Sequence, residues 1–202
     1  VDTSMGNLRS VARALHRAGA RVRVSDDPAA IRRAERVVVP GQGHFGAFRE
    51  ALSRGIGEAL VEHVGAGRPY LGICLGMQVL FEWSEEDEGV AGLGLLPGAV
   101  RRFPAGQPDP DEPARPLKVP HMGWNRVEGR HPLLPREGWF YFVHSYYCDP
   151  ADAAVVAGRC RYGLAFTAAV ARDNVFACQF HPEKSQRAGA ALLERFVEGK
   201  WS

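Results

Sequence analysis

Residues 69–78, with the sequence PYLGICLGMQ, constrain the fold of this chain more than any other stretch. Apolar residues run into a turn of small residues, Cys74 stands at its tip, and a helix-like pattern follows. A G-x-C-x-G elbow between a strand and a helix needs glycine on both sides of the central residue, because a Cβ there would crowd the neighbouring backbone. The pattern therefore predicts a strand that presents Cys74 on a sharp turn, a geometry that suits a nucleophile.

The position of Cys74 also suits its chemistry. A cysteine at the start of a helix lies near unpaired N–H groups and the positive end of the helix dipole, which favour thiolate over thiol. The same N–H groups can receive an oxyanion. A lone cysteine after a core strand is more often a buried packing residue, but the two flanking glycines favour a reactive site here.

The three other cysteines are interpreted as packing residues. Cys148, Cys160 and Cys178 lie in strand-like or apolar stretches, and no C-x-x-C pair occurs. Neither a disulfide framework nor a zinc site is indicated, and we expect no metal and no cofactor.

The chain around the elbow alternates strands with helices, which favours a parallel sheet covered on both faces. Val1 and Asp2 are interpreted as the end of a first strand. Further strands are predicted at 20–24, 36–39 and 69–73, helices at 8–18, 52–64 and 188–197, and antiparallel strands at 139–143, 153–160, 164–171 and 175–180. We expect one α/β domain over 1–202 with three layers: a mixed, mostly parallel sheet, helices on both faces, and added antiparallel strands.

Charge and hydropathy exclude several classes of protein. The formal net charge is only +2 and no long basic run occurs, so charge gives no case for nucleic-acid or membrane binding. No apolar run approaches the ~20 residues that span a bilayer, and no signal peptide opens the chain, so a cytoplasmic location is expected. Prolines are frequent in 103–120, which predicts an exposed loop.

A candidate base follows the last predicted strand. His181, held by Pro182 and followed two positions later by Glu183, can act as a proton carrier oriented by a carboxylate. His16, His63 and His131 are interpreted as surface residues. His44 and His144 are possible neighbours of the site, because each follows a predicted strand or turn at the carboxyl edge of the sheet.

These motifs together resemble the class I (triad) glutamine amidotransferases. The resemblance rests first on GICLGMQ at 72–78 and HPEKS at 181–185. Further matches at 5–11, 40–45, 120–125 and 141–146 narrow it to the glutaminase subunits of imidazole glycerol phosphate synthase. The resemblance implies the family's flavodoxin-like fold and hydrolysis of glutamine through a cysteinyl thioester. The ammonia would pass to a (β/α)8-barrel cyclase partner, as a heterodimer, for histidine biosynthesis.

The same resemblance implies roles for individual residues. Cys74, His181 and Glu183 would be catalytic. Oxyanion and glutamine binding would fall to Gln42, Gly43, Leu75, Gln78, Glu86, Ser145 and Tyr146, with Glu86 holding the α-ammonium group. Asn7, Met122, Trp124 and Asn125 would lie toward the partner. The family usually has valine where this chain has Gln42, a position whose peptide orientation is tied to activation.

Two other functions remain open at this stage. One is a sibling amidotransferase subunit that serves a different ammonia acceptor. The other is a non-catalytic, redox-sensing module on the same fold, which would require loss of His181 or Glu183, although both are present.

Overall fold

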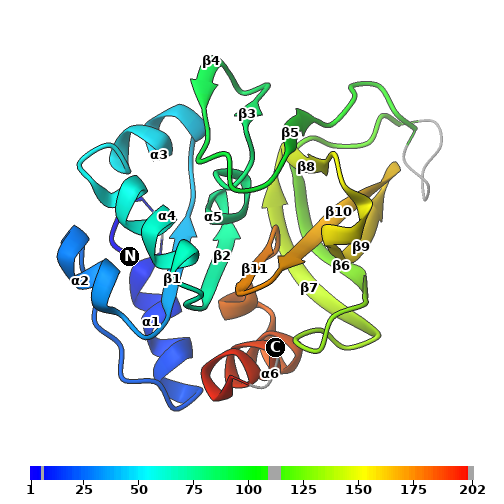
Figure 1. Ribbon diagram of the computed structural model, residues 1–202. Helices are drawn as coiled ribbons and strands as arrows, with labels where there is room; N and C mark the ends of the chain where they lie inside the picture. Colours follow the sequence, from blue (N-terminus) through cyan, green and yellow to red (C-terminus); the bar gives the residue numbers. More distant parts are fainter. Residues whose placement is uncertain (6, 109–114, 200–202) are drawn as a thin grey trace.

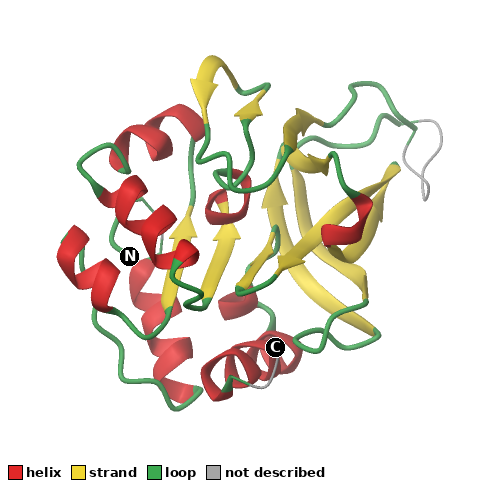
Figure 2. Cartoon of the chain, viewed as in Figure 1, coloured by secondary structure: helices red, strands yellow, loops and turns green. Residues whose placement is uncertain are grey.

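The computed structural model describes residues 1–5, 7–108 and 115–199. A single twisted sheet runs through the molecule, with helices packed on both sides of its N-terminal part (Figures 1 and 2). The helices are α1 (Leu8–Arg17), α2 (Pro28–Arg33), α3 (Phe45–Ala51), α4 (Ile56–Gly65), α5 (Leu75–Gln78) and α6 (Gln186–Glu198). Two short 3₁₀ helices are η1 (Ala153–Val155) and η2 (Pro182–Lys184).

The strands are β1 (Val37–Gly41), β2 (Tyr70–Cys74), β3 (Trp83–Ser84), β4 (Asp87–Ala91), β5 (Gly98–Arg102), β6 (His121–Gly129), β7 (Glu137–His144), β8 (Tyr146–Pro150), β9 (Val156–Tyr162), β10 (Leu164–Arg172) and β11 (Val175–Cys178). Their order is β1-β2-β11-β10-β8-β5-β3-β4, and β6 bridges β7 and β9 outside this row.

The sheet is mixed, as expected, but its parallel part is smaller than expected. Parallel pairing joins β1 to β2, β2 to β11, and β3 to β5. Every pairing in the described chain that involves β6, β7, β8, β9 or β10 is antiparallel. The reason is the connection type: strands joined by short turns pair antiparallel, whereas parallel neighbours need a crossover such as a helix.

Strand β2 is the centre of the core, and all five of its residues are buried. Because side chains alternate between the faces of a strand, Leu71 and Ile73 pack toward α1 and α6, whereas Tyr70 packs toward α3 and α4. Strand β11 repeats this alternation. The elbow that follows β2 therefore rests on a strand fixed from both faces.

Several expectations from the sequence are wrong. No strand forms at 20–24, where Val24 is 49% exposed, because no backbone among the described residues pairs with this segment in a ladder. Val1 and Asp2 are not assigned to a strand either, although the Val1 amino group donates to the Val38 carbonyl at 2.7 Å. His63 is buried rather than exposed, since it lies on the inner side of α4 and contacts the Pro69 carbonyl through Nε2 at 3.1 Å.

Other expectations are confirmed or lie outside the described chain. Helices α1, α4 and α6 and strands β1, β2, β7, β9, β10 and β11 are present with shifted ends, and Cys148, Cys160 and Cys178 are buried in the core. The middle of the proline-rich segment, 109–114, and Gly6 of the 5–11 motif fall outside the described residues. No helix in the described chain is long and apolar enough to cross a membrane.

Candidate active site

The elbow holds Cys74 in a backbone conformation that only a tightly built turn maintains. Cys74 adopts φ +55° and ψ −108°, and α5 begins at the next residue. A Cβ on Gly72 would overlap the Gly76 carbonyl, and one on Gly76 would overlap the Val39 carbonyl. The hydroxyl of Tyr70 donates to the Gly76 carbonyl at 2.7 Å. The need for both glycines, predicted from the sequence, is confirmed.

His181 is locked in place from its backbone and from its ring. Its N–H donates to the Tyr141 carbonyl of β7 at 2.9 Å, and the Ser185 hydroxyl donates to the His181 carbonyl at 2.6 Å. The same hydroxyl accepts from the Tyr141 N–H at 3.0 Å. Nδ1 of the ring lies 3.0 Å from Oε1 of Glu183, and both side chains are at most 2% exposed. The serine is a positioning residue that the sequence did not reveal.

The charge on His181 is set by its neighbours rather than by burial. Burial alone would lower the pKa of His181, but the sulfur of Cys74 and the carboxylate of Glu183 outweigh it and raise the pKa to about 9. Nε2 of His181 makes no hydrogen bond of standard geometry in the described chain, yet the sulfur of Cys74 lies close enough to raise the pKa of the ring. The raised pKa favours the protonated imidazole at neutral pH, a state that stabilises a neighbouring thiolate.

A cavity of about 270 Å³ opens over Cys74. Every residue predicted to bind the oxyanion or the substrate lines it: Gln42, Gly43, Leu75, Gln78, Glu86, Ser145 and Tyr146. Pro120, Val143 and His144 complete the wall. Residues from four distant parts of the sequence are thus brought to one edge of the sheet.

Two backbone segments border the thiol and could supply oxyanion donors. Leu75 is the first residue of α5, so its N–H has no partner within that helix. On the other side, Gly41 of β1 pairs with Cys74 of β2, and the chain then turns through Gln42 and Gly43. Gly43 has φ +108°, which L side chains rarely adopt.

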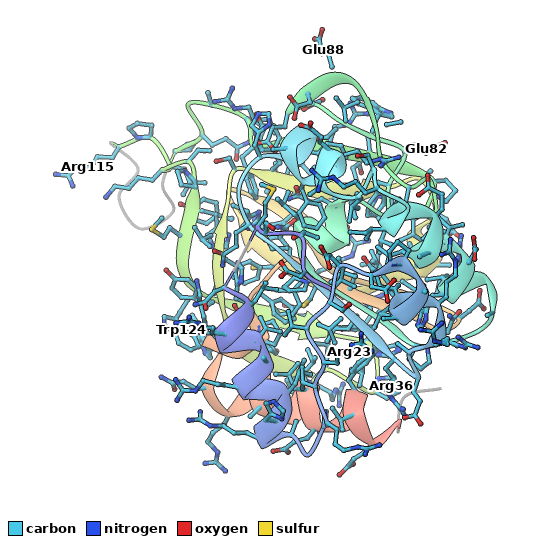
Figure 3. All side chains as sticks on the ribbon, turned by 90° about the vertical axis from the view of Figure 1, so that its left-hand side faces the viewer. Arg23, Arg36, Glu82, Glu88, Arg115 and Trp124 are labelled. Atoms are coloured by element: carbon cyan, nitrogen blue, oxygen red, sulfur yellow. The ribbon has the colours of Figure 1, made fainter. Side chains whose placement is uncertain are left out.

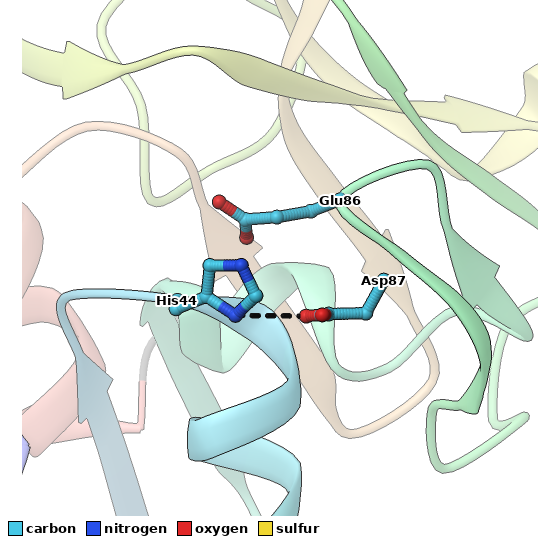
Figure 4. Close-up of side chains that lie close together, drawn as sticks. All are labelled: His44, Glu86 and Asp87. Atoms are coloured by element: carbon cyan, nitrogen blue, oxygen red, sulfur yellow. Dashed lines mark ion pairs between the residues drawn. The ribbon is translucent and has the colours of Figure 1, made fainter.

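Two carboxylates fix the far end of this turn (Figure 4). Oε2 of Glu86 accepts from the Phe45 N–H at 2.8 Å, and Oδ2 of Asp87 accepts from the Gly46 N–H at 2.6 Å. Asp87 also lies 2.9 Å from Nδ1 of His44. The three side chains are close enough to share a cation. Each carboxylate, however, already bonds the start of α3.

Two buried glutamines link Cys74 to the cavity wall. The Gln179 amide nitrogen lies 3.5 Å from Sγ of Cys74, and Oε1 of Gln179 accepts from Nε2 of Gln78 at 3.1 Å. Nε2 of Gln78 also donates to the Tyr146 carbonyl at 3.2 Å. Both amide hydrogens of Gln78 are thus used within the protein, and its Oε1 is the atom left for a ligand. Gln179 was not singled out from the sequence, although it stands two residues before His181.

The residues predicted to face a partner differ in exposure. Met122 and Trp124 on β6 are 62% and 43% exposed, and Trp124 projects at the edge of the molecule (Figure 3). Trp139 on the neighbouring β7 is 59% exposed and was not singled out from the sequence. Asn7 caps α1 by accepting a hydrogen bond from the Ser10 N–H, so its side chain stabilises the start of that helix.

Comparisons with known proteins agree on the family. Residues 1–199 match the family model described as Glutamine amidotransferase class-I. The chain is 52% identical to the imidazole glycerol phosphate synthase subunit HisH of Nitrosospira multiformis, over 99% of this chain and 96% of that protein. It is 50% identical to the subunit HisH 1 of Pseudomonas aeruginosa, over 100% and 97% of the two chains.

Solved structures agree on the fold. A crystal structure of a glutamine amidotransferase superposes with a TM-score of 0.74 at 20% identity, covering 96% of this chain and 94% of that one. PurLQS from Thermotoga maritima gives a TM-score of 0.67 at 18% identity, covering 97% and 94%.

Proposed function

Because the chain belongs to the class I glutamine amidotransferase family, we propose that it hydrolyses glutamine and delivers the ammonia to a cyclase subunit for imidazole glycerol phosphate synthesis in histidine biosynthesis. The observation that carries the chemistry is the buried His181–Glu183 pair, whose histidine has its pKa raised by the sulfur of Cys74, a residue that lines a cavity together with polar groups. The full-length similarity to HisH subunits supports the choice of acceptor.

The proposed reaction follows from the geometry. The Cys74 thiolate attacks the carboxamide carbon of glutamine, and the N–H groups of Leu75 and Gly43 bind the oxyanion. The His181 imidazolium gives its proton to the departing nitrogen, so ammonia leaves and a thioester remains. Neutral His181 then takes a proton from water as the oxygen attacks the thioester. Glutamate leaves and the thiolate–imidazolium pair is restored.

The cavity suggests how glutamine would be held. Glu86 bonds the Phe45 N–H through Oε2, which leaves Oε1 for the α-ammonium group. Oε1 of Gln78 and the Ser145–Tyr146 segment would complete the site. These assignments, and the role of the Met122–Trp124 face in binding a (β/α)8-barrel cyclase as a heterodimer, are part of the proposal. A cytoplasmic location goes with it.

The proposal is tested by measuring glutamate release with and without the cyclase subunit of a relative such as Nitrosospira multiformis. We expect little release from the chain alone and at least a tenfold rise with the cyclase, abolished in Cys74→Ala. Full activity without the cyclase would contradict the need for a partner. Stimulation by a different acceptor enzyme, but not by the cyclase, would favour a sibling amidotransferase. Glutamate release that persists in Cys74→Ala would show that Cys74 is not the nucleophile.

A further inference from the structure

A pair of buried histidines lies at the cavity wall. His121 on β6 and His144 at the end of β7 are 3% and 6% exposed. The two residues pair across the strands, and Nδ1 of His121 lies 2.9 Å from Nε2 of His144. Within the described residues, neither ring contacts a carboxylate. Phe103 and Phe166 stand edge-on or tilted against both rings, and Tyr162 stacks on His121.

The groups at the two ends of the pair fix where each proton lies. At one end the Tyr146 carbonyl can only accept, so Nδ1 of His144, 2.8 Å away, carries a hydrogen. At the other end the Asn125 amide nitrogen can only donate, so Nε2 of His121, 3.2 Å away, is bare.

A neutral imidazole has one donor and one acceptor. Nε2 of His144 is then an acceptor, and Nδ1 of His121 donates to it. Both rings are therefore neutral Nδ1–H tautomers, and all bonds in the line run in one direction, from Asn125 to Tyr146. An added proton on Nε2 of His144 would face the Nδ1–H of His121, and one on Nε2 of His121 would face the amide hydrogen of Asn125. In either case two donors would meet and one would lack an acceptor.

Burial agrees with the neutral state. It lowers the pKa of His121 to about 4 and that of His144 to about 3. Two buried imidazoles without a carboxylate partner cannot hold a cation at neutral pH.

One end of the line reaches the wall of the cavity, and the other reaches the backbone of β9. The Tyr146 carbonyl also accepts from Gln78, whose amide leads through Gln179 to Sγ of Cys74. At the far end, the second amide hydrogen of Asn125 donates to the Arg161 carbonyl of β9 at 2.9 Å. Asn125 itself stands on β6, and because side chains alternate between the faces of a strand, it points away from the face that carries the exposed Trp124.

We propose that Asn125, His121 and His144 are positioning residues, whose one-way hydrogen-bond line holds the Tyr146 wall of the glutamine cavity and connects it to β6, the strand whose opposite face carries Met122 and Trp124. This inference rests on the proposed function for its link to glutamine and the cyclase. A shift of β6 when a partner binds that face would reach Tyr146 and Gln78 through the line. The device regulates substrate binding without touching the reacting atoms.

Asn125→Asp is the sharpest variant, because it keeps the shape of the side chain. It also keeps the oxygen that accepts from the Arg126 N–H at 2.7 Å, but it removes both donors. The carboxylate would demand a hydrogen on Nε2 of His121, which changes the tautomer or the charge of that ring. We expect the KM for glutamine in the cyclase complex to rise about tenfold, the scale of one disrupted buried hydrogen bond, with kcat within about threefold.

Asn174→Asp is the matched control. The Asn174 amide nitrogen also donates to two carbonyls, those of Val64 and Arg68, at 3.0 and 2.6 Å. It lies beside Val175, which pairs with Tyr70 at the end of β2 remote from Cys74. The control loses equivalent hydrogen bonds, so we expect a comparable fall in melting temperature but an unchanged KM. An equal rise in KM in both variants would overturn the proposal.

The tautomers can also be measured directly, without an activity assay. In the ¹⁵N-histidine-labelled full chain at pH 7, imidazole nitrogen shifts should show both rings protonated at Nδ1 alone, with His121 altered in Asn125→Asp. An Nε2–H or doubly protonated ring in the wild type would overturn the proposal. Because this result does not depend on glutamine, it stands apart from the proposed function, which would fail if the wild-type complex released no glutamate.

Discussion

The histidine beside Cys74 and the histidine pair at the cavity wall are all buried, yet the first is cationic and the pair is neutral. His181, His121 and His144 are 1%, 3% and 6% exposed. Burial acts in the same direction on all three, toward the neutral ring. Nevertheless the pKa of His181 is raised to about 9, whereas the values for His121 and His144 are lowered to about 4 and about 3.

The difference lies in the groups that face each ring. His181 contacts a carboxylate and lies beside the Cys74 sulfur, and both favour the imidazolium. His144 contacts a carbonyl and a second imidazole, neither of which can balance a positive charge. One fold thus contains a cationic histidine suited to proton transfer and a neutral pair suited to fixed hydrogen bonding. The partner group, not the depth of burial, decides which role a histidine takes.

The largest effect should come from removing the cationic ring. His181→Asn should reduce glutamate release in the cyclase complex by about 10³-fold or more, because both proton transfers lose their carrier. The same change in the neutral pair, His121→Asn, should leave kcat within about tenfold. Steady-state assays of both variants measure the contrast. Equal losses in kcat would show that the two sites do not differ in kind.

A smaller effect is expected when the carboxylate is replaced. Glu183→Gln keeps the size of the side chain but removes the charge that supports the imidazolium, so kcat should fall by about 10²-fold or more. The pKa of His181 should move down from about 9 toward that of an ordinary histidine. Titration of the His181 ring signals measures this shift. An unchanged pKa would mean that Cys74 alone holds the cation.

The pH dependence of stability should separate His181 from the buried pair. Its folded-state pKa, about 9, lies above the ordinary value of 6.5. Its contribution is therefore fully present below pH 6.5 and is lost as the pH rises through about 9. Denaturant unfolding should show the wild type losing about 1–3 kcal/mol relative to His181→Asn over this interval. A constant difference would contradict a raised pKa.

The buried pair should show the opposite slope. The pKa of His144 is about 3 when folded, so between pH 6.5 and about 4 the unfolded chain binds a proton that the folded chain does not. Acidification over this interval should destabilise the wild type relative to His144→Phe by about 1–2 kcal/mol. Unfolding curves at each pH measure the difference. A gain in relative stability of the wild type on acidification would indicate a charged ring.

The active site and the buried histidine pair also differ in how much of each could be predicted from the sequence. The elbow was predictable because the spacing of Gly72, Cys74 and Gly76 has a single steric reason, overlap with the Val39 and Gly76 carbonyls. The His181–Glu183 pair was predictable because both partners are local, two residues apart. The residues around the cavity followed from a family resemblance and from the rule that strand ends meet at one edge of a sheet.

Features that depend on long-range pairing were not predictable. His121 and His144 meet only because β6 and β7 pair with one particular register, and no local pattern encodes that register. Burial of His63 depends on which side of α4 faces the core. The strand predicted at 20–24 does not form, and this too depends on long-range pairing. Its alternating residues are suitable, but a strand needs a neighbouring backbone, and none pairs with it as a ladder in the described chain.

The central claim is that Cys74 is the nucleophile because a cationic His181 stands beside it, and covalent capture tests this most directly. The chain with its cyclase is treated with a glutamine analogue that carries an electrophile at the amide position, and modified peptides are mapped by mass spectrometry. The analogue should label Cys74 and spare Cys148, Cys160 and Cys178, whose pKa values are raised by burial. Labelling should fall about 10²-fold or more in His181→Asn. Labelling of another cysteine in place of Cys74, or equal labelling in His181→Asn, would contradict the account.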